Sequence, residues 1–126
     1  MAEPEQLASA LRLLQGDGCP LRGIFDEATS RWATLIMAAL ITGPHRFAEL
    51  RDRLGGISEK MLAQKLKAMV RAGLVARDAK PTVPPQVTYS LTELGASMAG
   101  PLTGLFRWFG SHGDELTRAQ RAYDAG

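Results

Sequence analysis

The chain has 126 residues, of which 45% are hydrophobic and 22% charged, with one cysteine and a formal net charge of +2. This composition is typical of one globular domain with its own core, and it excludes a disordered chain, a disulfide scaffold and a cysteine-based zinc site. The longest apolar stretch, residues 32–41, is far shorter than the about 20 residues of a membrane-spanning helix. The acidic N-terminus lacks the basic start of a signal peptide, so we expect a cytoplasmic protein that does not enter the membrane.

Apolar residues at helical spacing predict five helices in the first part of the chain. They cover approximately residues 5–15, 21–28, 31–42, 46–54 and 58–72. Ser30 and Ser58 stand where N-caps are expected. Gly73 stands where the end of a helix favours a left-handed residue.

After Gly73 the apolar period changes from that of a helix to that of a strand. Residues 74–78 and 87–91 predict a hairpin with a proline-stiffened tip. A further helix, capped by Thr92, carries an apolar stripe, and Gly100-Pro101 should kink it. Two short helices joined by Gly55-Gly56 and followed by a hairpin predict a mainly α (α+β) winged helix-turn-helix with a two-stranded wing.

Basic residues are concentrated in the middle of the chain. Residues 44–80 hold nine basic and four acidic side chains, a net charge of +5, whereas the remainder carries −3. A basic centre between acidic ends is a candidate electrostatic footprint for nucleic acid. The alternative is a solvated surface on which the charges cluster by chance.

Several motifs in this order resemble the HxlR-type transcriptional regulators. They are Cys19-Pro20, Trp32, residues 43–50 (GPHRFAEL), 56–62 (GISEKML), 73–75 (GLV), 83–85 (VPP) and 89–95 (YSLTELG). The resemblance covers approximately residues 19–112. It implies a dimeric, DNA-binding winged helix related to the MarR-type regulators. We therefore divide the chain into an N-terminal helical arm (1–18), an HxlR-type domain with a C-terminal dimerisation helix (19–113) and a tail (114–126).

The helix over residues 58–72 is the predicted recognition helix. Lys60, Gln64, Lys67 and Arg71 recur at the spacing of one helix face, opposite an apolar stripe. A helix in the major groove contacts bases mainly through its N-terminal part. In this helix that part holds Ser58, Glu59, Lys60, Ala63 and Gln64. A Lys side chain can donate to the acceptors of guanine, Gln can pair with adenine, and Glu can accept a hydrogen bond from cytosine. An ordinary solvated helix face is the alternative.

The wing and the helix at 46–54 supply candidate contacts to the DNA backbone. Arg77 and Lys80 flank the hairpin tip, while Gln86 stands where the family usually has a basic residue, so wing contact is expected to be weaker. A stiff loop without a ligand is the alternative for the tip. Arg46 and Arg51 are further phosphate contacts, unless neighbouring carboxylates pair with them.

The N- and C-terminal helices carry more apolar residues than one small core can cover. The surplus residues are Leu7, Leu11, Leu102, Leu105, Phe106, Trp108 and Phe109. Two subunits would bury them together, which predicts a homodimer on a pseudo-palindromic operator in double-stranded DNA. A winged-helix module that binds another protein instead of DNA is the alternative.

Cys19 is a candidate redox-sensing residue, because some relatives sense oxidants or electrophiles through a cysteine near this position. The alternative is a small, packed and inert side chain. Oxidants, or a small molecule in an apolar crevice, are thus the candidate effectors. No motif for catalysis, a cofactor or a metal is present in the sequence, so we expect no enzyme.

Overall fold

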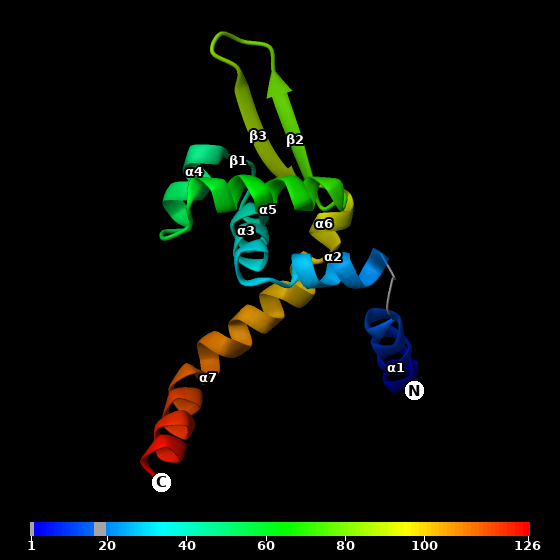
Figure 1. Cartoon of the computed structure of the whole chain (residues 1–126), viewed down its shortest axis with the longest axis vertical. Helices are drawn as coiled ribbons and strands as arrows, with labels where there is room; N and C mark the ends of the chain where they lie inside the picture. Colours follow the sequence, from blue (N-terminus) through cyan, green and yellow to red (C-terminus); the bar gives the residue numbers. More distant parts are fainter. Residues whose placement is uncertain (1, 17–19) are drawn as a thin grey trace.

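The computed structural model describes residues 2–16 and 20–126. It is mainly helical with one small antiparallel sheet, which confirms the predicted fold class (Figure 1). In chain order the elements are α1 (Ala2–Gln15), α2 (Pro20–Ala28), α3 (Arg31–Ile41), β1 (His45–Arg46), α4 (Phe47–Arg53), α5 (Glu59–Arg71), β2 (Val75–Lys80), β3 (Gln86–Leu91), α6 (Glu93–Ser97) and α7 (Ala99–Ala125).

Helix α3 lies at the centre of the fold, because its sequence is apolar on nearly every side. Its Ile36 and Met37 have no exposed surface. Helices α5 and α7 and strand β3 pack around it, and α5 contributes Leu62 and Leu66 to the same core. This packing fixes the orientation of α5, so that the face of α5 opposite its leucines lies at the surface.

The sheet has three strands in the order β1–β3–β2, one more than the predicted hairpin. β2 and β3 pair antiparallel in unbroken register, from Val75 opposite Leu91 to Lys80 opposite Gln86. β1 pairs with the other edge of β3 through only two residues. A two-residue strand carries no alternating pattern, so the sequence could not predict it. Because α4 follows β1 directly, this pairing places α4 against the sheet.

Two glycines in the left-handed region stand at the ends of α5. Gly56 (φ +96°) precedes the helix, and Gly73 (φ +80°) follows it, as predicted. Ser58 is the predicted N-cap, because its hydroxyl accepts a hydrogen bond from the backbone N–H of Met61 (3.0 Å). Ser30 also occupies the N-cap position of α3, but its hydroxyl donates back to a carbonyl of α2 (2.8 Å).

The C-terminal region differs from the prediction in two ways. The predicted kink is a break that comes earlier, because α6 ends at Ser97 and α7 begins after Met98. Pro101 has no N–H for the carbonyl of Ser97 and its ring crowds that oxygen, so the first helix ends there. Residues 114–126, which we expected to form a tail, continue α7 as far as Ala125.

Helix α7 is much longer than the core that it contacts. Its 27 residues span about 40 Å at 1.5 Å per residue. In Figure 1, α7 and α1 extend from the body on the side away from the wing, which β2 and β3 form beside α5. The molecule therefore has one end formed by α5 and the wing, and an extended helical end formed by α1 and α7.

Candidate nucleic-acid interface

Helix α5 has one buried apolar face and one exposed polar face. The side chains of Leu62, Leu66 and Met69 are at most 1% exposed. On the opposite side lie the exposed residues Lys60, Ala63, Gln64, Lys67 and Arg71, which we call the polar face of α5. Its three cations have no ion-pair or hydrogen-bond partner among the described residues. The structure thus brings together the residues predicted for the recognition helix and leaves them accessible.

Two of the predicted DNA-binding residues, Arg51 and Glu59, form an ion pair with each other. The distance from Arg51 Nη1 to Glu59 Oε1 is 2.8 Å, and Arg51 Nε lies 3.2 Å from Asp52 Oδ1. These hydrogen bonds, the one with Glu59 first, raise the pKa of Arg51 above its ordinary value. The pair is exposed, so its contribution to stability is small, but it partly neutralises Arg51 beside the N-terminus of α5.

Arg46 and Arg53 have different surroundings, although both flank α4. The backbone N–H of Arg46 donates to Glu49 Oε1 (2.7 Å), which caps α4 and leaves the Arg46 side chain exposed. Arg53 Nη1 lies 3.0 Å from both Thr42 Oγ1 and His45 Nε2. A guanidinium can only donate, so His45 Nε2 accepts, and Nδ1 donates to a backbone carbonyl at 2.7 Å. Arg53 therefore buttresses β1, whereas Arg46 is available to a ligand.

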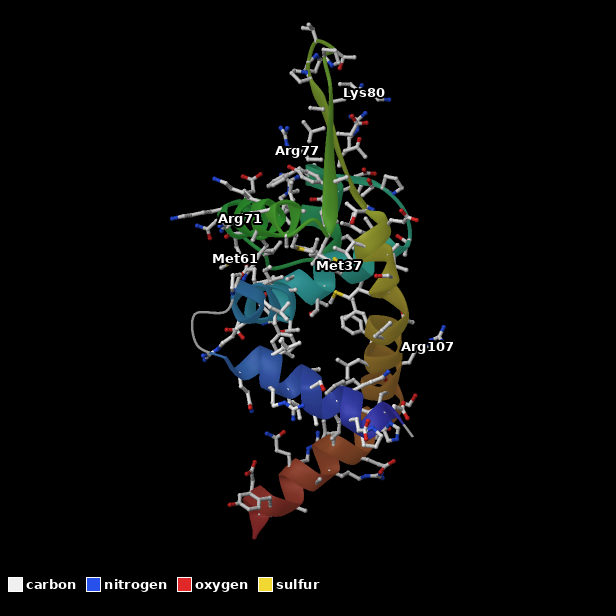
Figure 2. All side chains as sticks on the ribbon, turned by 90° about the vertical axis from the view of Figure 1, so that its right-hand side faces the viewer. Met37, Met61, Arg71, Arg77, Lys80 and Arg107 are labelled. Carbon is white, nitrogen blue, oxygen red and sulfur yellow. The ribbon has the colours of Figure 1, made fainter. Side chains whose placement is uncertain are left out.

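The two basic residues of the wing lie on opposite faces of the hairpin. Side chains alternate along a strand, and Arg77 and Lys80 are separated by an odd number of positions. In Figure 2 their side chains project to opposite sides of the wing. Lys80 stands directly opposite Gln86 in the register, so their side chains share one face. Lys80 on the neighbouring strand therefore supplies the positive charge that the family usually has at the position of Gln86.

A hollow of about 260 Å³ separates α5 from the base of the wing. We call it the helix–wing hollow, and its lining consists of Ala63, Lys67, Val70, Arg77 and Tyr89. Sequence reasoning did not single out Tyr89, because its alternation with polar neighbours marks only a strand. The pairing of β2 with β3, which sets Tyr89 opposite Arg77, is what brings it to this surface.

A second hollow, of about 460 Å³, lies between α2 and α5. Its lining includes the apolar side chains of Ile24, Met69 and Leu74. Near it, Lys65 Nζ lies 3.2 Å from Glu27 Oε1, and this ion pair ties α5 to α2. Cys19 lies outside the described residues, so its predicted sensing role, like a small-molecule effector, stays a prediction.

The residues predicted for a dimer interface fall into two groups. Leu102 is only 5% exposed and belongs to the core of the protomer, because the first turns of α7 pack on α3. This differs from its predicted place between subunits. The other predicted residues are exposed: Leu7 and Leu11 on α1, and Leu105, Phe106, Trp108 and Phe109 on α7. They remain available to a second copy of the chain.

No helix in the described parts of the chain is long and apolar enough to span a membrane. Within residues 2–16 and 20–126, no three His, Cys, Asp or Glu side chains are grouped as a metal site would require. The surface around α5 and the wing presents exposed cations and hydrogen-bonding side chains, which suit a polyanion.

Comparison with known proteins agrees with this surface. The family described as HxlR-like helix-turn-helix matches residues 27–117. The HTH-type transcriptional regulator YtfH of Escherichia coli (strain K12) is 47% identical over 95 residues, which is 75% of each chain. The structure of the transcriptional regulator YtfH from Salmonella typhimurium superposes with a TM-score of 0.77 at 43% identity, covering 85% of this chain and 95% of that one.

The redox regulator HypR in its oxidised form is a further structural relative. It has a TM-score of 0.68 at 31% identity, over 74% of this chain and 96% of its own. These relatives are regulators and not enzymes. They favour a DNA-binding regulator over the alternative of a winged-helix module that binds another protein instead of DNA. The chain belongs to the HxlR-like helix-turn-helix family and is a DNA-binding transcriptional regulator.

Proposed function

We propose that this regulator acts as a homodimer that inserts the polar face of each α5 into the major groove of a pseudo-palindromic operator. The observation that carries the proposal is the exposed and unpaired state of this face, with the wing beside it. The major groove admits a helix, and its base edges distinguish all four base pairs. The helix therefore supplies sequence recognition, and its surroundings supply affinity.

Base reading falls to the N-terminal half of the polar face. Lys60 can donate to the acceptors of guanine, and Gln64 can pair with adenine through two hydrogen bonds. The methyl group of Ala63 suits contact with the methyl group of thymine. Ser58 and the N-terminus of α5 face a phosphate, where free backbone N–H groups favour negative charge.

Residues around the N-terminal half of the polar face provide contacts to phosphate. Arg71 follows at the C-terminal end of α5, and Arg46 lies exposed at the start of α4. Lys80, on the outer face of the wing, provides the charge missing at Gln86. Such contacts add affinity for any sequence and make binding sensitive to salt.

The apolar stripe of α7 and the leucines of α1 would form the dimer interface. Phe109 is 55% exposed and Leu7 62% exposed, and burying the part of each side chain that is still exposed would contribute about 1–2 kcal/mol. A two-fold dimer would set its recognition helices about 34 Å apart, or a multiple of that, to meet successive turns of DNA. A two-fold symmetric operator follows from this arrangement.

A response to oxidants through Cys19 is part of the proposal. Its support is the likeness to a structure described as a redox regulator, together with the single cysteine of this chain. With one thiol per chain, an oxidative bridge would have to join two molecules, or the thiol would have to take a small-molecule adduct. Because DNA and the regulator must meet, we expect a cytoplasmic location.

The test is selection of bound sequences from random duplex DNA by the full-length protein, followed by the same selection with Gln64→Ala and Lys60→Ala. Each variant should relax the preference at one position per half-site, by about 1–3 kcal/mol against the preferred base. Arg71→Gln is the matched comparison, because it should weaken all sequences alike. A selected site without two-fold symmetry, or unchanged preferences in both N-terminal variants, would overturn the proposal.

A further inference from the structure

We infer that the helix–wing hollow binds one phosphate of the DNA backbone, and that the Tyr89 hydroxyl donates a hydrogen bond to it beside Lys67 and Arg77. This inference rests on the proposed placement of α5 in the major groove. It assigns a DNA-binding role to a residue of the sheet in addition to the residues of α5 and the wing.

The sheet and the helix together bring these three side chains to one place. Arg77 and Tyr89 are directly opposite each other in the β2–β3 register, so both lie on the same face of the hairpin. That face is the one that carries Val75, which is 2% exposed and packs into the core beneath α5. Lys67 comes from the adjoining side of α5, and all three line the same hollow.

The chemistry of the lining suits a phosphate. It contains two cations and a phenol, and none of the described residues that line it carries a carboxylate. Lys67 and Arg77 have no partner in the described parts of the chain, and neither has the Tyr89 hydroxyl. Ala63 and Val70 complete the hollow with small apolar groups, which leave room for an oxygen to approach the donors.

The position of the hollow matches the path of a DNA strand. A helix in the major groove and a wing directed at the neighbouring minor groove lie on either side of one sugar–phosphate backbone, since that backbone is the wall between the two grooves. The helix–wing hollow lies between α5 and β2–β3. The intervening strand must therefore pass over it.

Tyr89 contributes something that the two cations do not. Its ring is half-buried and packs against the core, so the hydroxyl is held in place before DNA arrives and loses little conformational entropy on binding. The flexible Lys67 and Arg77 are exposed and must be ordered. A fixed neutral donor adds a hydrogen bond to the phosphate without adding charge.

The first experiment measures the affinity of Tyr89→Phe for a random-sequence duplex and for a selected operator, over a series of salt concentrations. We expect affinity for both duplexes to fall by about tenfold, with no change in the slope of log affinity against log salt, because no charge is removed. Lys67→Gln and Arg77→Gln should each reduce that slope by about one. Tyr123→Phe is the matched control, because the other tyrosine of the chain is 86% exposed at the far end of α7.

The second experiment locates the phosphate by replacing the phosphates of the operator one at a time with uncharged methylphosphonates. A methylphosphonate at one particular phosphate should abolish the loss of affinity caused by Tyr89→Phe and also the loss caused by Arg77→Gln. Wild-type affinity in Tyr89→Phe, or effects that vanish at different phosphates, would overturn the inference. Failure of the proposed base reading is seen separately, as unchanged base preference in Gln64→Ala, because the random-sequence duplex reports on phosphate binding alone.

Discussion

Gly95 is the residue at which the structure predicts the largest effect of adding one methyl group. It is buried in α6, and a Cβ placed on it would overlap the carbonyl oxygen of Leu74 and lie 3.0 Å from the carbonyl carbon. Both are backbone atoms at the start of the wing, so they cannot rotate away. In Gly95→Ala, α6 must therefore move by about 1.5 Å to restore van der Waals contact with this oxygen at about 3.5 Å.

The hydrogen bonds that this movement breaks set the size of the effect. The backbone N–H of Thr92 donates to Leu74 O (3.1 Å), and its hydroxyl donates to Gly73 O (2.6 Å). Loss of both costs about 2 kcal/mol, and overpacking strain adds about 1–3 kcal/mol. The better helix propensity of Ala offsets about 1 kcal/mol of this loss of stability. We expect the free energy of unfolding to fall by about 2–4 kcal/mol, within these ranges.

Urea unfolding followed by circular dichroism, at one fixed protein concentration, measures this change. Gly23→Ala is the matched control, because Gly23 lies inside α2 and a Cβ there meets nothing within 4 Å. The control should leave stability unchanged or raise it by up to about 1 kcal/mol. If Gly95→Ala were as stable as the unaltered protein, close contact between α6 and Leu74 would be refuted.

Three further predictions concern assembly and regulation. Phe106→Asp should shift the protein from dimer to monomer in light scattering, because it buries a charge between subunits. Ser111→Asp should not, because Ser111 is exposed and lies about 140° around the helix axis from Phe106; dimers in both variants would contradict the interface. Glu59→Gln should raise the affinity for random-sequence duplex several-fold at low salt, because it frees Arg51 from its ion pair. A loss of affinity confined to the operator would mean instead that Glu59 contacts a base. A mild oxidant should change the operator affinity of the unaltered protein by about 5–150-fold and leave that of Cys19→Ser unchanged; an equal change in both would place the sensor elsewhere.

The sequence by itself determined the features that depend on neighbours within one or two helical turns. The two faces of α5, its cap at Ser58 and its stop at Gly73 follow from local spacing and local hydrogen bonds. The hairpin follows from alternation and its proline tip. Because many such motifs occur in a fixed order, the sequence also determined the family.

The tertiary structure alone decided which side chains meet. The register of the hairpin sets Tyr89 beside Arg77 and Lys80 beside Gln86, and periodicity within one strand contains no information about its partner. The packing of α7 on α3 places Leu102 in the core and leaves Phe109 exposed, although both share one helical stripe. The physical reason is that burial and cross-strand contact depend on where the elements pack, and a local pattern fixes only the face on which each residue lies.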